Sequence, residues 1–202
     1  MSKLNKIMAL IVIIFTTFVI VQSETKAACP DGFTSITKVV TVGNCDYDVF
    51  LCVRCPYGPV PGEIHFTGYT LSNPNCINSL NMNQVFDGIK AAISVYPFIQ
   101  DLCEQLQAPP CNEAQEMTFW WYNCWNKELV DYFGEDHIVY NACEYNTYCK
   151  QVIKYCWNGN SFNETIVSTN QIGTPTCPVE VPPDPTQYNQ PTTCFRIDTP
   201  CD

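Results

Sequence analysis

The sequence predicts an α+β or mainly β fold: a small disulfide-rich secreted domain with short antiparallel strands, one or two central helices and an extended Pro-rich C-terminal segment. Three observations lead to this prediction. The 202 residues include 14 cysteines, an even number that is typical of a disulfide framework. Short runs with alternating apolar residues follow the leader. Seven of the 15 prolines fall in residues 173–202, where they exclude a long helix.

Residues 1–27 have the organisation of a secretory signal peptide. Lys3 and Lys6 precede an uncharged apolar run at 7–21, and a polar stretch then leads to Ala27. An uncleaved membrane anchor is the alternative, but the run of about 15 residues is shorter than the roughly 20 that a spanning helix needs. We therefore expect a globular domain at 28–176 and an extended segment at 177–202. The protein would be secreted or at the cell surface, with membrane contact only before cleavage.

All the cysteines lie after the leader, which fits export to an oxidising compartment. We expect every one of them to form a disulfide, although the sequence leaves the connectivity open. The set is Cys29, Cys45, Cys52, Cys55, Cys76, Cys103, Cys111, Cys124, Cys143, Cys149, Cys156, Cys177, Cys194 and Cys201.

Cys52 and Cys55 form a C-x-x-C, for which a redox dithiol or half of a zinc site are the alternatives to structural disulfides. Residues three apart on a strand point to opposite faces, so we expect these two sulfurs to have different partners. There is no second C-x-x-C to complete a zinc site. We predict neither a metal nor a cofactor.

The order of the elements follows from the spacing of apolar residues. Strands are expected at 33–42 and 46–55, joined at Gly43-Asn44, and a third at 63–71. Helical spacing at 85–96 predicts a helix that Pro97 ends, and a second short helix is expected at 98–106. The Pro-rich tail could complete its own sheet or lie along the edge of a neighbour.

Aromatic residues are dense from 117 to 168, and strands are favoured there because aromatic and β-branched side chains fit a pleated surface. Within this region, residues 144–157 also satisfy helical spacing. Asn158-Gly159 serves equally as a helix stop or as a hairpin turn. We favour the hairpin.

The run of aromatic residues at 119–125 suggests a binding surface for a sugar or a protein. On a strand, Trp121 and Trp125 share a face with Phe119, whereas Trp120 and Tyr122 share the other face. One set is expected in the core, and the other is either exposed or covered by helices. Trp121 and Trp125 are the possible ligand-binding residues.

No catalytic pattern stands out. The two histidines, His65 and His137, are expected to be exposed, with His65 on a solvent-facing side of its strand together with Glu63, Thr67 and Tyr69. Asp46 and Asp48 lack the remainder of a calcium loop. Acidic residues at 113–136 could supply the carboxylate pair of a hydrolase, but solubility explains them as well.

The formal net charge of −10 excludes the basic surface that a nucleic-acid partner requires. We therefore expect a secreted, non-enzymatic extracellular protein with a structural, cell-surface or adhesive role. Such a protein could self-associate through strand edges or its tail, or have an extracellular protein or glycan partner. The alternatives are a carbohydrate- or ligand-binding module that uses exposed aromatics, and a secreted hydrolase with paired carboxylates.

Overall fold

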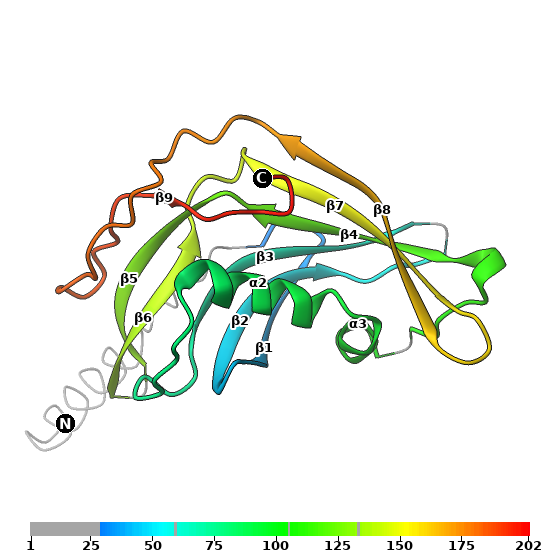
Figure 1. Ribbon diagram of the computed structural model, residues 1–202, viewed down its shortest axis with the longest axis horizontal. Helices are drawn as coiled ribbons and strands as arrows, with labels where there is room; N and C mark the ends of the chain where they lie inside the picture. The colour runs from blue at the N-terminus through cyan, green and yellow to red at the C-terminus, as the bar shows by residue number, and fades with distance from the viewer. Residues whose placement is uncertain (1–28, 59, 105, 133) are drawn as a thin grey trace, which may run out of the picture.

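A computed structural model of the chain describes residues 29–202, except residues 59, 105 and 133 (Figure 1). The predicted signal peptide at 1–27 lies outside the described residues. The fold class is confirmed, because the described residues form a mainly β domain with 47% strand, two short helices and seven disulfides. No helix within the described part is both long and apolar enough to span a bilayer.

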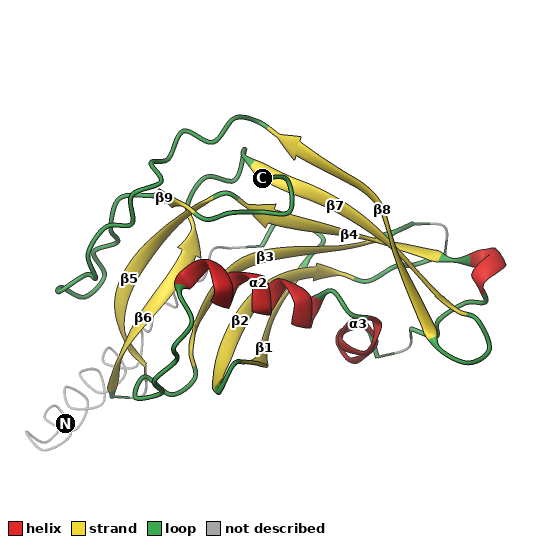
Figure 2. Cartoon of the chain, in the orientation of Figure 1, coloured by secondary structure: helices red, strands yellow, loops and turns green. Residues whose placement is uncertain are grey.

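The elements follow the predicted order, with most boundaries within a few residues of the expected ones (Figure 2). They are β1 (Thr34–Val42), β2 (Cys45–Arg54), β3 (Gly62–Leu71), α2 (Met82–Ile93), α3 (Tyr96–Leu102), a 3-10 turn (Cys111–Glu113), β4 (Gln115–Tyr122), β5 (Cys124–Tyr132), β6 (Glu135–Ala142), β7 (Tyr148–Trp157), β8 (Phe162–Ile172) and β9 (Phe195–Arg196).

All the strands belong to one sheet with β3 at its branching point. On one side β3 pairs antiparallel with β2, which pairs with β1. On the other side its first half pairs in parallel with β4, whereas Gly68 and Tyr69 pair with β6. The sheet then continues through β7 to β8 in one direction and through β5 to β9 in the other. It curves around the two helices, which leaves an inner face toward them and an outer face away from them (Figure 1).

The helices begin where the sequence offers suitable caps. Asn81 and Gln84 form a reciprocal capping box at the start of α2, so two otherwise unpaired backbone N–H groups are satisfied. The sequence predicted that Pro97 ends the first helix, but that helix already ends at Ile93. Pro97 lies in the first turn of α3, where the missing N–H of proline costs nothing.

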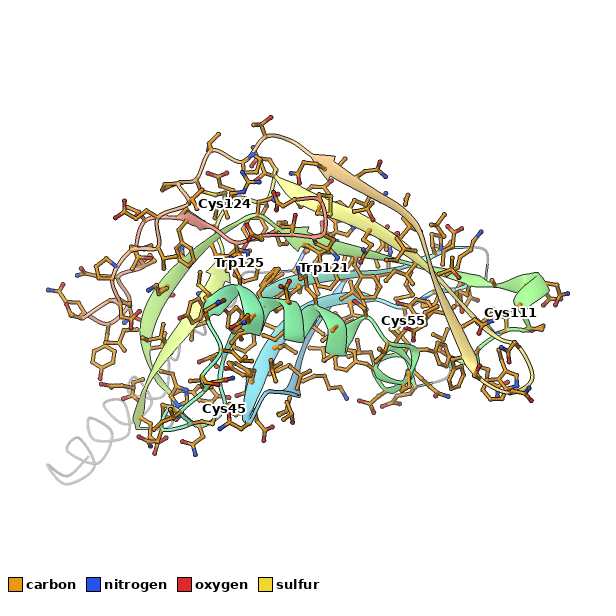
Figure 3. All side chains as sticks on the ribbon, viewed as in Figure 1. Cys45, Cys55, Cys111, Trp121, Cys124 and Trp125 are labelled. Carbon is orange, nitrogen blue, oxygen red and sulfur yellow. A yellow bond between two sulfur atoms is a disulfide. The ribbon has the colours of Figure 1, made fainter. Side chains whose placement is uncertain are left out.

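The hydrophobic core lies between the inner face and α2. Phe86 of α2 packs 5.3 Å from the ring of Phe66 on β3 and 5.3 Å from that of Trp125 on β5. Gly88 allows the helix to approach β1, because a Cβ at this position would lie 2.3 Å from a methyl carbon of Val42. Many of the side chains of Figure 3 converge on this layer, Trp121 and Trp125 among them.

A β-bulge in β3 corrects one prediction from the sequence. Cys52 pairs with His65, and Phe50 with Gly68, so the register shifts at Thr67. The extra residue reverses the alternation, since residues beyond a bulge change faces. Tyr69 therefore lies with Phe66 on the inner face, where their rings stack 6.0 Å apart, and not beside His65.

The hairpin preferred for residues 144–157 and 161–168 is confirmed, with strands at 148–157 and 162–172. β7 and β8 pair antiparallel from Tyr148–Ile172 to Trp157–Phe162. Gly159 lies in the turn between them with φ of +100°, a backbone conformation that glycine adopts without strain.

Every cysteine is paired, as predicted. The seven bridges are Cys29–Cys52, Cys45–Cys76, Cys55–Cys103, Cys111–Cys156, Cys124–Cys177, Cys143–Cys194 and Cys149–Cys201. The two sulfurs of the C-x-x-C have different partners, one in the N-terminal segment and one at the end of α3. This extensive covalent framework is compatible with an extracellular protein.

The C-terminal segment completes the sheet of its own chain. Its three cysteines attach it to the domain, and β9 pairs antiparallel with β5. Upstream of β9, the backbone N–H of Asn189 donates to Leu129 and that of Thr192 to Lys127. The tail therefore covers the β5 edge of the sheet.

Candidate functional site

The structure buries both residues that the sequence offered as ligand contacts. Trp121 and Trp125 are 1% and 0% exposed, so neither ring can reach a ligand, and the prediction is wrong (Figure 3). Both belong to the core: Trp121 stacks on Phe119 at 5.3 Å, and the indole N–H of Trp125 donates to the carbonyl of Tyr122 at 2.8 Å. Their side of the strands is the side that α2 covers.

The alternate residues of β4, Trp120 and Tyr122, lie on the outer face instead. Parallel pairing of β3 with β4 places Trp120 directly opposite His65, although 55 positions separate them in the chain. Side chains from three strands (β2, β3 and β7) and two loops join them. We call this group the outer-face cluster: Phe33, Arg54, Glu63, His65, Trp120, Tyr122, Tyr145 and Tyr148.

Three rings of the cluster form a lateral stack across β3, β4 and β7. The ring of Trp120 lies 4.2 Å from that of His65 on one side and 4.2 Å from that of Tyr148 on the other, at angles of 16° and 20°. Phe33 contacts His65 edge to face at 4.7 Å. Both faces of the indole are therefore covered, and Trp120 is half-buried.

A pocket of about 510 Å³ lies over this stack. Its lining includes His65, Trp120, Tyr122, Pro30 and Tyr145. The ring of Tyr145 is 47% exposed and stands at 81° to that of Tyr122, so it offers a flat apolar surface beside the pocket. The Cys29–Cys52 disulfide fixes the N-terminal wall.

Hydrogen bonding in the cluster is incomplete. Glu63 accepts from Arg54 at 2.6 Å, and Nδ1 of His65 lies 2.9 Å from the hydroxyl of Tyr122. The other ring nitrogen, Nε2, is 3.9 Å from the Glu63 carboxylate, beyond hydrogen-bond distance. Seven buried side-chain N or O atoms in the described part of the chain have no partner, and three belong to this cluster: Nε of Arg54, Nε2 of His65 and Nε1 of Trp120.

The imidazole of His65 and the phenols of Tyr122 and Tyr145 stay neutral across the physiological range. Burial, and secondarily the charge of Arg54, lowers the pKa of His65 from 6.5 to about 4. Burial raises the pKa of Tyr122 and of Tyr145 above the ordinary value of 10. The imidazole and the phenols therefore act as neutral hydrogen-bonding groups near pH 7.

The histidines were expected to be exposed, and both are buried. His65 is 4% exposed because Trp120 and Phe33 cover its ring. His137 is 2% exposed because the turn after β3 lies over it, and its Nδ1 is 3.0 Å from the carbonyl of Leu71. Alternation on a strand cannot show which outward residues the neighbouring segments cover.

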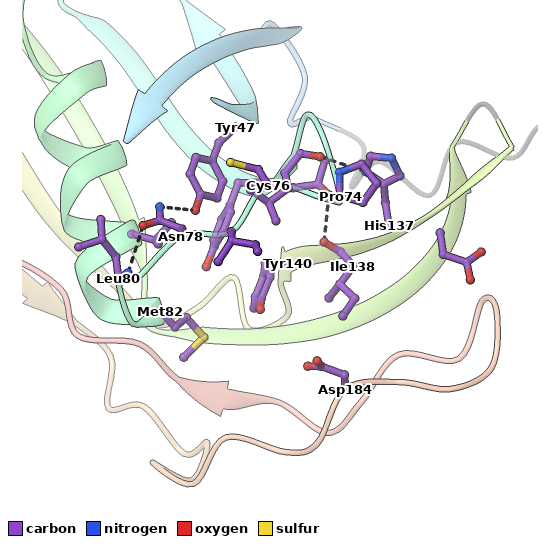
Figure 4. A pocket seen from close by; sticks show the side chains of 16 residues that line it. Tyr47, Pro74, Cys76, Asn78, Leu80, Met82, His137, Ile138, Tyr140 and Asp184 are labelled. Carbon is purple, nitrogen blue, oxygen red and sulfur yellow. Dashed lines mark hydrogen bonds between the residues drawn. The ribbon is translucent and has the colours of Figure 1, made fainter. Parts of the chain in front are cut away.

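A second pocket, of about 450 Å³, lies where β3 and β6 meet the segment before α2 (Figure 4). Tyr47 lines it and accepts a hydrogen bond from Asn78 at 2.9 Å. The rings of Tyr69 and Tyr140 stack at 4.6 Å with an interplanar angle of 2°. The buried hydroxyl of Tyr69 has no partner among the described residues. This pocket therefore has one buried polar atom without a partner, whereas the outer-face cluster has three.

The other candidate groups are engaged in structural contacts. Asp46 accepts from Thr41, and Asp48 from Ser72. One set of residues in the described ranges has metal-ligand geometry, Cys124, Glu144 and Cys177, but its two sulfurs form a disulfide. Thiolates bind metals, and sulfurs in a disulfide are not thiolates.

The carboxylates considered for hydrolysis are spread over separate elements. Asp131 and Asp136 are cross-strand neighbours near the β5–β6 turn, and both are exposed there. Asp131 accepts from the backbone of Gly134, and Asp136 from the hydroxyl of Tyr188.

No protein-family model, curated protein or solved structure matches the chain.

Proposed function

We propose that this protein is an exported, non-enzymatic binding protein, of surface or adhesive type, that recognises a neutral carbohydrate at the outer-face cluster. One observation carries the proposal: two residues that line an aromatic pocket on the outer face, His65 and Trp120, each have an unpartnered buried ring nitrogen, and so does Arg54, which pairs with the lining residue Glu63. This face points away from both helices of the described residues (Figure 1). Buried polar groups are normally paired, and unpaired ones in a pocket indicate groups kept for a ligand.

The chemistry of the cluster favours a sugar. The N–H groups of Trp120 and Arg54 are donors that suit hydroxyl oxygens, while the ring of Tyr145 offers an apolar surface for the C–H face of a pyranose. Because the unpartnered nitrogens are buried, small side-chain rotations would accompany binding. Arg54 is already paired with Glu63, so the site has little net charge and favours a neutral glycan over an anionic one.

The pKa shifts support binding over acid–base catalysis. A general acid or base works best when its pKa lies near the working pH. His65, with a pKa of about 4, and Tyr122, with a raised pKa, are both shifted away from neutrality. Groups of this kind hold fixed hydrogen bonds but exchange protons poorly at pH 7.

The test is binding of the disulfide-intact protein to an array of neutral oligosaccharides, with two variants of the site. Trp120→Phe removes an N–H that has no protein partner, so no internal hydrogen bond is lost. Tyr145→Ala removes the exposed ring of the lining. We expect each variant to lose at least about tenfold in affinity, which corresponds to about 1.4 kcal/mol.

Tyr132→Ala is the matched control, because Tyr132 is 43% exposed and lies at the end of β5, in a part of the sheet that does not form the pocket. It should leave binding unchanged. Absence of any bound glycan, or binding that survives both site variants, would refute the proposal.

A further inference from the structure

The strand β8 is an exposed edge of the sheet. It is the last strand of the sheet, and its one partner within the described residues is β7. Ten of its eleven residues are exposed, and Ser168 is half-buried. Ile166 and Val167 are 60% and 48% exposed. Alternate backbone N–H and C=O groups of an edge strand point away from the sheet and are available to another strand.

The other ends of the sheet are covered or charged. The tail lies along β5, as described above. On β1, Lys38 forms an ion pair with Asp101 at 2.5 Å, and a lysine on an edge strand opposes pairing. β8 contains no Lys, Arg or Pro, and its single charged residue, Glu164, accepts a hydrogen bond from the backbone of Tyr96. A bulge at Val167 limits pairing locally.

Charge and covalent structure indicate what covers this edge. A chain with a net charge of −10 repels its own copies over most of its surface, so self-contact is favoured where charge is sparse. β8 carries one carboxylate in eleven residues. The tail of another copy is excluded as the added strand, because three disulfides hold each tail on its own domain.

We propose that β8 of one copy pairs antiparallel with β8 of a second copy, which makes the protein a twofold dimer with a continuous sheet. The same segment is used on both sides, so the contact closes and leaves neither β8 edge open. In an antiparallel pair within one sheet the twofold axis is perpendicular to the sheet. The outer faces of both copies therefore point to the same side.

The dimer places two outer-face clusters on one surface. If those clusters bind glycan, as proposed above, a dimer contacts a glycan-coated surface at two points. Two linked sites increase retention by about 10²- to 10⁴-fold over one. This consequence rests on the proposed function, whereas the dimer itself does not.

Sedimentation equilibrium of the full disulfide-bonded protein tests the dimer without any glycan. We expect a dimer mass for the wild type and a monomer mass for Ile166→Lys and Val167→Lys, since lysine on the edge opposes pairing. Both positions are largely exposed, so these variants should fold. Val39→Lys on β1, 59% exposed, is the matched control and should remain dimeric.

Hydrogen exchange gives a second readout, in which the amides of β8 become more protected as the protein concentration rises. A wild type that stays monomeric at about 100 µM, or a dimer that persists with unchanged mass in both lysine variants, would overturn the proposal. Soluble oligosaccharide binding separates the two proposals, because the monomeric variants should keep the affinity of a single site while losing retention on a glycan-coated surface.

Discussion

The buried imidazole of His65 makes the stability of the protein depend on pH, and replacement by phenylalanine should remove that dependence. His65→Phe keeps a ring to contact Trp120 and Phe33 but cannot be protonated. In the folded protein the pKa of His65 is lowered to about 4, first by burial and then by Arg54. In the unfolded chain it returns to about 6.5.

The sign and size follow from proton linkage. Between about pH 6.5 and pH 4 the unfolded state binds the proton that the folded His65 refuses, so lowering the pH in this window destabilises the fold. Above about pH 6.5 the imidazole is neutral in both states and does not reduce the stability. The loss of stability grows as the pH falls from about 6.5 to about 4 and does not increase further below pH 4. At about 1.4 kcal/mol per pH unit, the shift corresponds to about 3 kcal/mol.

Urea unfolding at pH values from 7 to 4 measures this effect. The free energy of unfolding of the wild type, minus that of His65→Phe, should fall by about 3 kcal/mol from pH 7 to pH 4. Loss of the Tyr122 hydrogen bond adds a constant offset that does not alter the slope. The reasoning is refuted if this difference is the same at every pH, or if the His65 resonances in a proton NMR titration show a midpoint near 6.5.

Two further predictions concern the framework of the fold. Replacing Cys55 and Cys103 together by alanine removes a crosslink between residues 48 positions apart. The free energy of unfolding should fall by about 4 kcal/mol, because the unfolded chain gains the entropy of an open loop. Chemical denaturation measures this loss, and a value below about 1 kcal/mol contradicts the expectation. Gly68→Ala should lower the free energy of unfolding by on the order of 1–3 kcal/mol, because the new Cβ would lie 2.8 Å from the backbone carbonyl oxygen of Tyr140 on β6. An unchanged melting temperature would contradict this close approach.

The local patterns of the sequence were sufficient for most of the fold. Alternating residues predicted the β1–β2 hairpin and β3, and helical spacing predicted α2 and α3. These signals are local, since one strand or helix needs only its own residues to show its period. The disulfide framework was also predicted, but not its connectivity, which depends on where distant segments meet.

The site needed information that no local pattern contains. Alternation divided Trp120 and Tyr122 from Trp121, but which set is buried depends on the face that α2 covers. The neighbour of Trp120 is His65, through a parallel pairing between strands that are far apart in the chain.

The alternation of apolar and polar residues, with its period of two, also cannot reveal the bulge at Thr67. It moved Tyr69 away from the outer face while leaving His65 there. Sequence patterns therefore located the aromatic segment correctly but could not show that Trp121 and Trp125 are the buried alternate residues.

The indole N–H resonances of the tryptophans test the central claim most directly. In a ¹H–¹⁵N spectrum of the disulfide-intact protein, titrated with the neutral oligosaccharide that binds most strongly on the array, the Trp120 signal should shift as its N–H gains an acceptor. The Trp125 signal is the internal reference, because that N–H already donates to Tyr122 within the core. A bound glycan that leaves Trp120 unmoved, or that moves Trp125 in its place, would contradict the assignment of the site to the outer face.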